Sequence, residues 1–449
     1  MISNNKTHWF KPNSASLSLL PLLLFLCVFV VFGIGSFDGK QLSLSPTVAI
    51  IPAIFLAFCW EPRAFNKNLD VFMAGVGHPN ILIMCFVFLL SGAFSQVMAS
   101  IGGIDATVNF ALYYIPSQFI LPGIFVVSSF ISLAMGTSMG TIGAVTPIAV
   151  GICHTAGVDL TIGIGAVLSG AMFGDNLSII SDTTIAAVQT QGCEMKDKFK
   201  MNFFIALPAM MFSLLILSTY AQDNYVSHVG DFNILKVLPY IMVLFFSLAG
   251  MHVYLILILG TLIGGAVGLL SSDYTMTQYT MEIYKGFTLM EEILILSMFI
   301  GGLSELIKHQ GGIAYLIGKV LSFSHRFNRN GKPNKTIGEL SIALMSSVAD
   351  ICTANNTISI LMAGDASRDI AKRYGITAPR AASLLDIFAC VFQGLLPYSA
   401  QVLLAASIAG VSPLSLVGKV HYCYFLGIST LFTVFFKVRE KAHKISRLA

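Results

Sequence analysis

Long apolar stretches recur along the chain from Leu17 to Phe436, and short polar segments separate them. Several run for about 18 residues or more with few charges, which is the length that an α-helix needs to cross a bilayer. Backbone groups inside lipid must be hydrogen-bonded internally, so these stretches are expected to be helices. The pattern predicts an all-α polytopic protein with roughly 10–14 membrane segments, and the lipid bilayer as its first partner.

Composition supports the membrane assignment and limits the remaining functions. Hydrophobic residues make up 55% of the chain and charged residues 11%, and the mean hydropathy is +0.80. The formal net charge of +4 comes from Lys and Arg residues that are assigned to loops, so no nucleic-acid binding is expected. The sequence contains no motif of a hydrolase, metalloenzyme or nucleotide-binding enzyme, which predicts a protein that is not an enzyme and has no cofactor.

The chain resembles itself in two places. Residues 92–104 (GAFSQVMASIGGI) match residues 301–313 (GGLSELIKHQGGI) at an offset of 209. Further along, a Thr-containing segment that begins at Thr137 matches one that begins at Thr353, at an offset of 216. Because the two matches occur in the same order, they predict two repeats of similar length.

The repeats divide the chain into five parts. Two transmembrane repeats are predicted at residues 17–220 and 232–436, and a polar external linker at residues 221–231 joins them. A cytoplasmic N-terminus is predicted at residues 1–16 and a basic cytoplasmic tail at residues 437–449.

Positive charge in the loops predicts how the repeats are oriented. Lys and Arg crowd into segments such as residues 192–200, 319–335 and 365–380, whereas residues 99–117 and 154–160 contain neither. Because loops rich in Lys and Arg stay in the cytoplasm, corresponding loops of the two halves lie on opposite sides of the membrane. The repeats are therefore predicted to have inverted topology, which is typical of secondary transporters that work by alternating access.

Each half contains one apolar stretch that is rich in small polar residues. These stretches are GTSMGTIG at residues 136–143 and CTANNTIS at residues 352–359. They are candidates for broken or re-entrant helices, whose unwound carbonyl groups can coordinate a small cation. Close helix packing would also explain the glycines of the first stretch. The side chains expected to add oxygen ligands for Na⁺ are those of Thr137, Ser138, Thr353, Asn355, Asn356 and Thr357.

A second polar element follows in each half. Residues 175–184 (DNLSIISDTT) align at the offset of 216 with residues 391–400, which places Asp182 opposite Tyr398. The first half thus has carboxylates where the second half has none, so any ion chemistry is asymmetric. The polar candidates for an ion or substrate site in the first-half element are Asp175, Asn176, Ser178, Ser181, Asp182 and Thr183.

Asp175 and Asp182 are the main candidates for an exchange site, because charge at membrane depth is costly and usually functional. A desolvated carboxylate can bind either a proton or Na⁺, but not both well. Asp182 is the first candidate for this group and Asp175 the second, although either could cap a helix break instead. Asp350 and Asp386 also lie in apolar sequence, where they could line the path or pair with a buried polar group.

The run GTSMGT at residues 136–141, followed by SGAMFGDNLSIISDTT at residues 169–184, resembles the signature of NhaC-type sodium/proton antiporters within a wider ion-transporter superfamily. The resemblance covers most of the chain. It implies a two-repeat secondary transporter in which Asp175, Asp182 and the neighbouring hydroxyl groups line the ion path. Where the family typically has Lys after the first of these aspartates, this chain has Asn176.

These observations predict a secondary antiporter of a bacterial inner membrane that exchanges Na⁺ for H⁺, with both termini in the cytoplasm. Because a Lys beside Asp175 is missing, an organic substrate becomes more credible. The alternative is therefore a Na⁺- or H⁺-coupled carrier of an amino acid or small carboxylate. The run from Asn355 to Thr357 is similar to the Ser-Asn-Thr elements by which dicarboxylate carriers hold sodium and substrate. Stoichiometry and pairing into a homodimer stay open.

Overall fold

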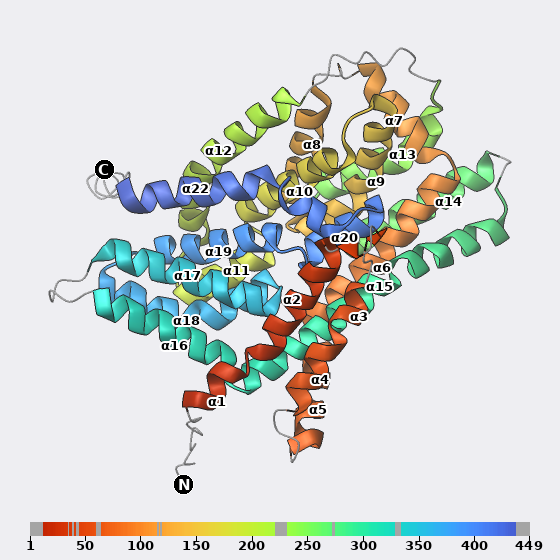
Figure 1. Cartoon of the computed structure of the whole chain (residues 1–449). Coiled ribbons are helices and arrows are strands. Elements are labelled where there is room, and N and C mark those ends of the chain that lie inside the picture. Colours follow the sequence, from red (N-terminus) through yellow and green to blue (C-terminus); the bar gives the residue numbers. More distant parts are fainter. Residues whose placement is uncertain are drawn as a thin grey trace, which may run out of the picture. The chain divides into compact units, whose positions relative to one another are not determined.

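The computed structural model describes residues 12–34, 36–37, 40–41, 45–59, 64–114, 116, 119–220, 231–271, 274–327 and 334–436 (Figure 1). Within them the chain is helical apart from its turns and one short antiparallel pair, β1 (Ser36–Phe37) and β2 (Lys40–Gln41). The predicted all-α class is therefore confirmed. Residues 1–11 of the predicted N-terminus, residues 221–230 of the predicted linker and the whole predicted tail at 437–449 lie outside the described residues.

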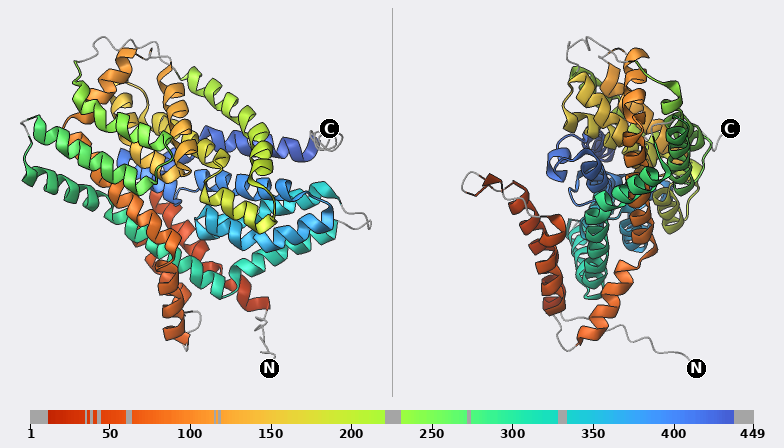
Figure 2. Two further views of the ribbon diagram at one scale, coloured as in Figure 1. Left: turned by 180° about the vertical axis from the view of Figure 1, so that it is seen from behind. Right: turned by 90° about the vertical axis from the view of Figure 1, so that its right-hand side faces the viewer.

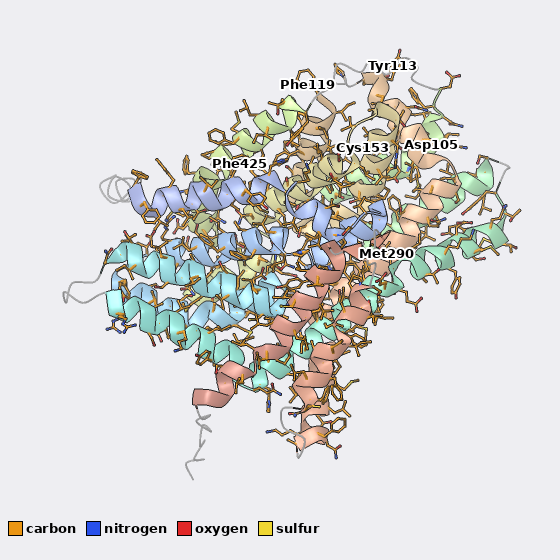
Figure 3. The ribbon with its side chains drawn as sticks, in the orientation of Figure 1. Asp105, Tyr113, Phe119, Cys153, Met290 and Phe425 are labelled. Carbon is orange, nitrogen blue, oxygen red and sulfur yellow. The ribbon has the colours of Figure 1, made fainter. Side chains whose placement is uncertain are left out.

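Eight helical stretches in the described residues are long and apolar enough to cross a membrane, and six shorter apolar helices accompany them. Large apolar side chains stand on the outer surface of two of these helices, α12 (Met195–Thr219) and α14 (Val253–Leu270), as lipid contact requires (Figure 3). The chain is thus a polytopic membrane protein, as predicted. The eight stretches are Pro79–Ser100, Ser138–Ala156, Leu160–Gln191, Met195–Thr219, Val253–Leu270, Met276–His309, Lys335–Thr353 and Ala378–Ala409.

One compact unit comprises residues 1–82 and 295–327. A methyl group at Gly75 would overlap the backbone of Gly301, so two of its helices touch without a side chain between them. The side-chain amide of Gln310 donates to the carbonyl of Ala57 over 3.1 Å. The helices of this unit are α1 (Pro12–Leu17), α2 (Leu20–Ile34), α3 (Pro46–Ala49), α4 (Ile51–Cys59), α5 (Phe65–Val76), α16 (Gly312–Phe327) and parts of α6 (Pro79–Ser100) and α15 (Met276–His309).

The second unit comprises residues 83–294 and 328–449 and holds most of the polar residues singled out above. Helix α10 (Leu160–Leu177) is its most buried element and packs against α8 (Ile120–Met135), α9 (Ser138–Ala156), α12 and α22 (His421–Phe436). Figure 1 shows α17 (Lys335–Thr353), α18 (Asn356–Tyr374) and α19 (Ala378–Leu395) side by side, and in Figure 2 α11 (Asp182–Gln191, yellow) lies against α18 (blue). The remaining helices are α7 (Gly103–Tyr114), α8 (Ile120–Met135), α9 (Ser138–Ala156), α10 (Leu160–Leu177), α11 (Asp182–Gln191), α13 (Ile234–Leu248), α17 (Lys335–Thr353), α18 (Asn356–Tyr374), α19 (Ala378–Leu395), α20 (Ala400–Ala409), α21 (Pro413–Val417) and α22 (His421–Phe436).

Helix lengths recur within the second unit. Helices α9 and α18 each have 19 residues, α10 and α19 each have 18, and α11 and α20 each have 10. Left-handed residues end the helices at matching places, namely positions 136 and 354, 157 and 375, and 192 and 410, each pair 218 residues apart. We call α8 to α11 the first series and α17 to α20 the second series. The two series share one register of 218 residues. Their inverted topology stays a prediction.

This register corrects the offset of 216 that the Thr residues suggested. Thr137 is the N-cap of α9, and the corresponding N-cap of α18 is Asn355, not Thr353. A short match between apolar segments pairs residues of the same type, whereas the helix ends pair residues at the same place in the backbone. At an offset of 218, Asp175 corresponds to Gln393 and Asp182 to Ala400, so the pairing of Asp182 with Tyr398 is wrong.

Candidate functional site

Four helix breaks interrupt the membrane-spanning part of the second unit. Helix α8 gives way to α9 at residues 136–137, and α17 gives way to α18 at residues 354–355. Helix α10 is separated from α11 by residues 178–181, and α19 from α20 by residues 396–399. Each break exposes carbonyl groups at one helix end and N–H groups at the next, which form partial charges suited to ions. The predicted broken helices are present in both series.

Asp175 lies at the C-terminal end of α10 and is only 6% exposed. Its two carboxylate oxygens accept hydrogen bonds from Ser138 at the start of α9, over 2.8 Å, and from Ser181 in the break after α10, over 2.5 Å. The hydroxyl of Thr183, on α11, lies 2.9 Å from that of Ser181. One carboxylate and three hydroxyl groups from successive elements thus form a set of hard oxygen ligands of the kind that Na⁺ prefers.

A chain of side-chain amides joins this group to the second series of helices. Gln401 donates to the hydroxyl of Ser138 over 3.2 Å and accepts from Gln393 over 2.7 Å. Gln393 also donates to the carbonyl of Ala354, in the break before α18, over 3.1 Å. The sequence reasoning missed both glutamines. The register of 218 residues could have pointed to Gln393, because it places this residue at the position that corresponds to Asp175.

Asp182 does not take the buried position predicted for it. It is the first residue of α11 and its side chain is exposed, as are those of Ile179 and Ile180 in the same break. A carboxylate in the first turn of a helix interacts favourably with the helix dipole without being buried. Of the two aspartates, Asp175 is therefore the buried carboxylate in the structure.

Asp386 belongs to a second polar cluster, built around an ion pair with Lys198. The ammonium and carboxylate are 2.7 Å apart, and both side chains are 1% exposed. The same carboxylate oxygen accepts from the side-chain amides of Asn176 and Asn202, each over 2.9 Å. Lys198 donates further to the hydroxyl of Thr184 and to the carbonyl of Asn176. A buried ion pair is tolerated where such hydrogen bonds complete it.

Two basic residues that were assigned to cytoplasmic loops are instead buried in helices. Lys198 lies in α12, and Arg380 lies in α19 where it pairs with Glu339 over 2.8 Å. A count of charges in a sequence window cannot show which side chains turn inward. Lys198 also places its ammonium within hydrogen-bond distance of the carbonyl of Asn176. This positive charge is paired with Asp386, so it adds no net charge beside Asp175.

The polar side chains of the second-series break bind their own helix end. Asn355 caps α18 by accepting from the N–H of Ile358, and Asn356 accepts from the N–H of Thr357, each over 3.0 Å. The hydroxyl of Thr353 donates to the carbonyl of Ala349 over 2.9 Å. Among the described contacts, none joins these side chains directly to Asp175.

The remaining candidates lie near the breaks in different roles. Thr137 is the half-buried N-cap residue of α9 and makes no side-chain capping bond. The hydroxyl of Ser178 donates to the carbonyl of Leu133 over 3.0 Å and so ties the break after α10 to the end of α8. Asp350 is fully buried in the last turn of α17.

The segment that contains the Asp175 group can also be compared with known proteins. Residues 64–221 match the Na⁺/H⁺ antiporter family. This stretch includes Asp175 together with its hydroxyl partners Ser138 and Ser181, and the predicted resemblance to NhaC-type sodium/proton antiporters is confirmed.

Several antiporters are similar to this chain over most of their length. The chain is 22% identical over 432 residues to the malate-2H⁺/Na⁺-lactate antiporter of Bacillus subtilis (strain 168), which covers 88% of this chain and 89% of that protein. It is 20% identical to the Na⁺/H⁺ antiporter NhaC of Alkalihalophilus pseudofirmus, with 78% and 80% covered. It is 23% identical to the arginine/ornithine antiporter ArcD of Halobacterium salinarum, with 80% and 79% covered. These relatives are transporters and not enzymes, as predicted for this chain.

A solved structure of the YdaH transporter from Alcanivorax borkumensis superposes with a TM-score of 0.41 and 12% identity, covering 94% of this chain and 97% of that one.

Proposed function

We propose that this protein is a secondary antiporter that exchanges Na⁺ for H⁺ across a bacterial inner membrane by alternating access. The observation that carries the proposal is the burial of Asp175 at a helix break with two hydroxyl groups on its oxygens. An ionisable side chain held at membrane depth is by default part of an ion or proton pathway. The antiporter family match over the same residues supports the assignment.

Competition for the Asp175 carboxylate would couple the two ions. In the described state Ser138 and Ser181 donate to the two oxygens of the carboxylate. When Na⁺ enters, the same two hydroxyl groups would turn their oxygens toward the ion and become ligands beside the carboxylate. When Na⁺ leaves, a proton neutralises the carboxylate, because an unpaired charge is costly at this depth. One carboxylate therefore carries one ion or the other in each direction.

The helix breaks supply hinges about which access to the ion site could alternate between the two sides of the membrane. Residues 178–181 separate α10 from α11, so the hydroxyl groups of Ser181 and Thr183 can move relative to Asp175 without bending a helix. The Lys198 and Asp386 ion pair stands beside this hinge and is electrically neutral as a pair. It holds α10, α12 and α19 together through Asn176 while adding no net charge to the path.

The second candidate function is coupled transport of an amino acid or a small carboxylate. Two of the relatives are named as antiporters of such solutes. In this chain, α9 and α11 begin without side-chain caps, whereas α18 and α20 are capped by Asn355 and Ser399. Uncapped helix N-termini attract carboxylate groups. An organic anion would therefore have donors available on the side of the first series.

Reconstitution in liposomes tests both candidates. The purified full-length protein is placed in vesicles loaded with a pH-sensitive dye, a proton gradient is imposed, and Na⁺, Li⁺ or K⁺ is added in turn. Proton movement on addition of Na⁺ supports the cation antiporter. If no cation moves protons, while malate, lactate, arginine or ornithine exchanges across the same membrane, the carrier of organic solutes takes its place.

A further inference from the structure

Asp350 differs from the other buried aspartates in having no partner for its charge. It is 0% exposed, and neither carboxylate oxygen accepts a hydrogen bond from a described residue. By contrast, Asp175 accepts from two hydroxyl groups, and Asp386 pairs with Lys198 and two amides. The described ion pairs include none to Asp350.

The position of Asp350 in its helix makes a negative charge still less favourable. It lies in the last turn of α17, where the carbonyl groups of the helix end present partial negative charge. Removing an unpaired carboxylate from water costs so much that such a group takes up a proton instead. An ionised Asp350 would therefore be costly at this position.

A neutral acid also fits the hydrogen bonds around it. The hydroxyl of Ser359 lies beside Asp350 but gives its own proton to the carbonyl of Asn356 over 2.8 Å. The oxygen of Ser359 can therefore accept a hydrogen bond from the protonated carboxyl group.

The titratable groups that face Asp350 are Cys352 and Tyr398, and neither is positively charged. The phenol of Tyr398 belongs to the break between α19 and α20 and donates to the carbonyl of Ile351 over 2.7 Å. Asp350 is therefore enclosed by both breaks of the second series. A movement of either break would change its access to water, which is what a transported proton requires.

We infer that Asp350 is a second proton-carrying site of the transport cycle, separate from the cation site at Asp175. This inference rests on the proposed function and specifies its stoichiometry. Asp175 exchanges one Na⁺ for one proton, and Asp350 carries a further proton in the same direction as the first. During the Na⁺ half of the cycle, a movement of the breaks would have to bring the ionised Asp350 into contact with water. Each cycle then moves one Na⁺ against two protons, so one net positive charge crosses the membrane.

Transport by Asp350→Asn tests the inference, because Asn keeps the shape of the neutral acid but cannot release a proton. Proteoliposomes with an imposed potassium diffusion potential are used to follow Na⁺ and proton movement together. The wild type is expected to move about two protons per Na⁺ and to respond to the potential, and the variant to move about one and to become insensitive. Asp369→Asn, which alters an exposed aspartate of α18, is the matched control.

The register offers a second variant in case Asp350→Asn does not fold. Ser132 is the residue of the first series that corresponds to Asp350, so Asp350→Ser places a neutral hydroxyl that the related helix already accommodates. An Asp350 variant that still moves two protons per Na⁺, or a wild type that moves only one, overturns the inference while leaving the antiporter intact. A variant that loses Na⁺ exchange as well, although folded, overturns the separation of the two sites.

Infrared difference spectra test the protonation of Asp350 without relying on a transport measurement. At neutral pH and without Na⁺, the wild type and Asp369→Asn are expected to show a protonated carboxyl band of Asp350 that is missing from Asp350→Asn, in which the band of Asp175 remains. Absence of this band in the wild type overturns the inference even if transport is normal. Absence of any Na⁺-driven proton movement in the wild type counts against the proposed function instead, so the two failures are distinguishable.

Discussion

The two series of helices in the second unit have the same lengths and breaks, but they carry charge at different places. The backbone repeats every 218 residues, so each series has two breaks with helix ends facing each other. The buried aspartates are not repeated, because each has a neutral residue as its counterpart. The pairs are Asp175 with Gln393, Ser132 with Asp350, and Leu168 with Asp386. The repeated backbone thus supplies hinges in both series, while residue differences at single corresponding positions decide where an ion or proton can be held.

The helix caps show the same division of roles. In the second series Asn355 and Ser399 use their side chains to cap α18 and α20, whereas Thr137 and Ser181 leave α9 and α11 uncapped. The hydroxyl of Ser181 is bonded to Asp175 instead. The first series therefore leaves helix-end groups available to a ligand, and the second series satisfies them internally.

Removal of the first-series carboxylate is expected to have the largest effect. Asp175→Asn keeps the size of the side chain but removes its charge, so Na⁺-driven proton movement should fall by about 100-fold or more. Measurements in proteoliposomes check this. Gln393→Met, at the corresponding position, is the matched control and should reduce transport far less, since it removes no charge. Equal losses in both variants would show that the charge asymmetry does not decide the function.

Loss of one partner of the buried ion pair should have the next largest effect. Asp386→Asn leaves the ammonium of Lys198 buried without a counter-ion, which is expected to lower the free energy of unfolding by about 3–5 kcal/mol. Denaturant unfolding in detergent measures the change. The double variant Lys198→Met with Asp386→Leu, which uses the residue found at position 168, should recover most of the stability. A single variant as stable as the wild type would contradict this account.

A smaller effect is expected at the N-cap of α10. Asp159 accepts from Thr161 and Ile162, whereas Thr377, at the corresponding start of α19, makes no side-chain capping bond. Asp159→Ala should lower the free energy of unfolding by about 1 kcal/mol at neutral pH, and Thr377→Ala by much less.

The effect at Asp159 should depend on pH. The hydrogen bond from the Thr161 side chain, helped by the N–H groups of Thr161 and Ile162, holds the pKa of Asp159 below its usual range. Because the folded-state pKa is lowered, the ionised form stabilises the fold. This contribution is complete above the unfolded-state pKa, about 3.9, and is lost as the pH falls through the lowered value. Unfolding measurements at several pH values should find the variant and wild type converging in acid.

The smallest effect is expected where the first series has glycine and the second does not. Ala354 has a φ of 48°, and Gly136 has a φ of 68° at the corresponding break. Ala354→Gly relieves a left-handed conformation but adds flexibility to the unfolded chain, so a gain of about 0.5–1 kcal/mol is expected. Gly136→Ala should do the reverse, since its methyl group would also meet Ile180. Thermal unfolding checks both, and a less stable Ala354→Gly protein would contradict the comparison.

Helix breaks were predictable from the sequence because they depend on local residues. The runs at 136–143 and 352–359 carry small polar residues where a spanning helix would carry apolar ones, and both contain a break. The group around Asp175 was partly predictable for the same reason, since Ser181 and Thr183 are its neighbours in the chain. Ser138 is 37 residues away and was predicted separately, from the small polar residues of its own stretch at 136–143.

The buried ion pair was not predictable in this way. Lys198 stands among other basic residues and resembles a loop charge, but one face of α12 turns it toward Asp386, which is 188 residues further along the chain. Gln393 and Gln401 were missed because an uncharged amide in an apolar helix gives little signal until its partners are known. These interactions depend on which helix faces pack together, and a sequence pattern does not record that.

The sequence by itself determined that this chain is helical, that it spans a membrane, where its helices break and which side chains could carry charge. Those properties follow from local polarity and from the need of buried backbone groups for hydrogen bonds. Tertiary structure alone decided which aspartate is buried, which is paired with Lys198 and which has no hydrogen-bond partner among the residues that the structure describes. Burial and pairing arise from contacts between distant helices, and the energy of a charge at membrane depth depends on those contacts more than on its place in the sequence.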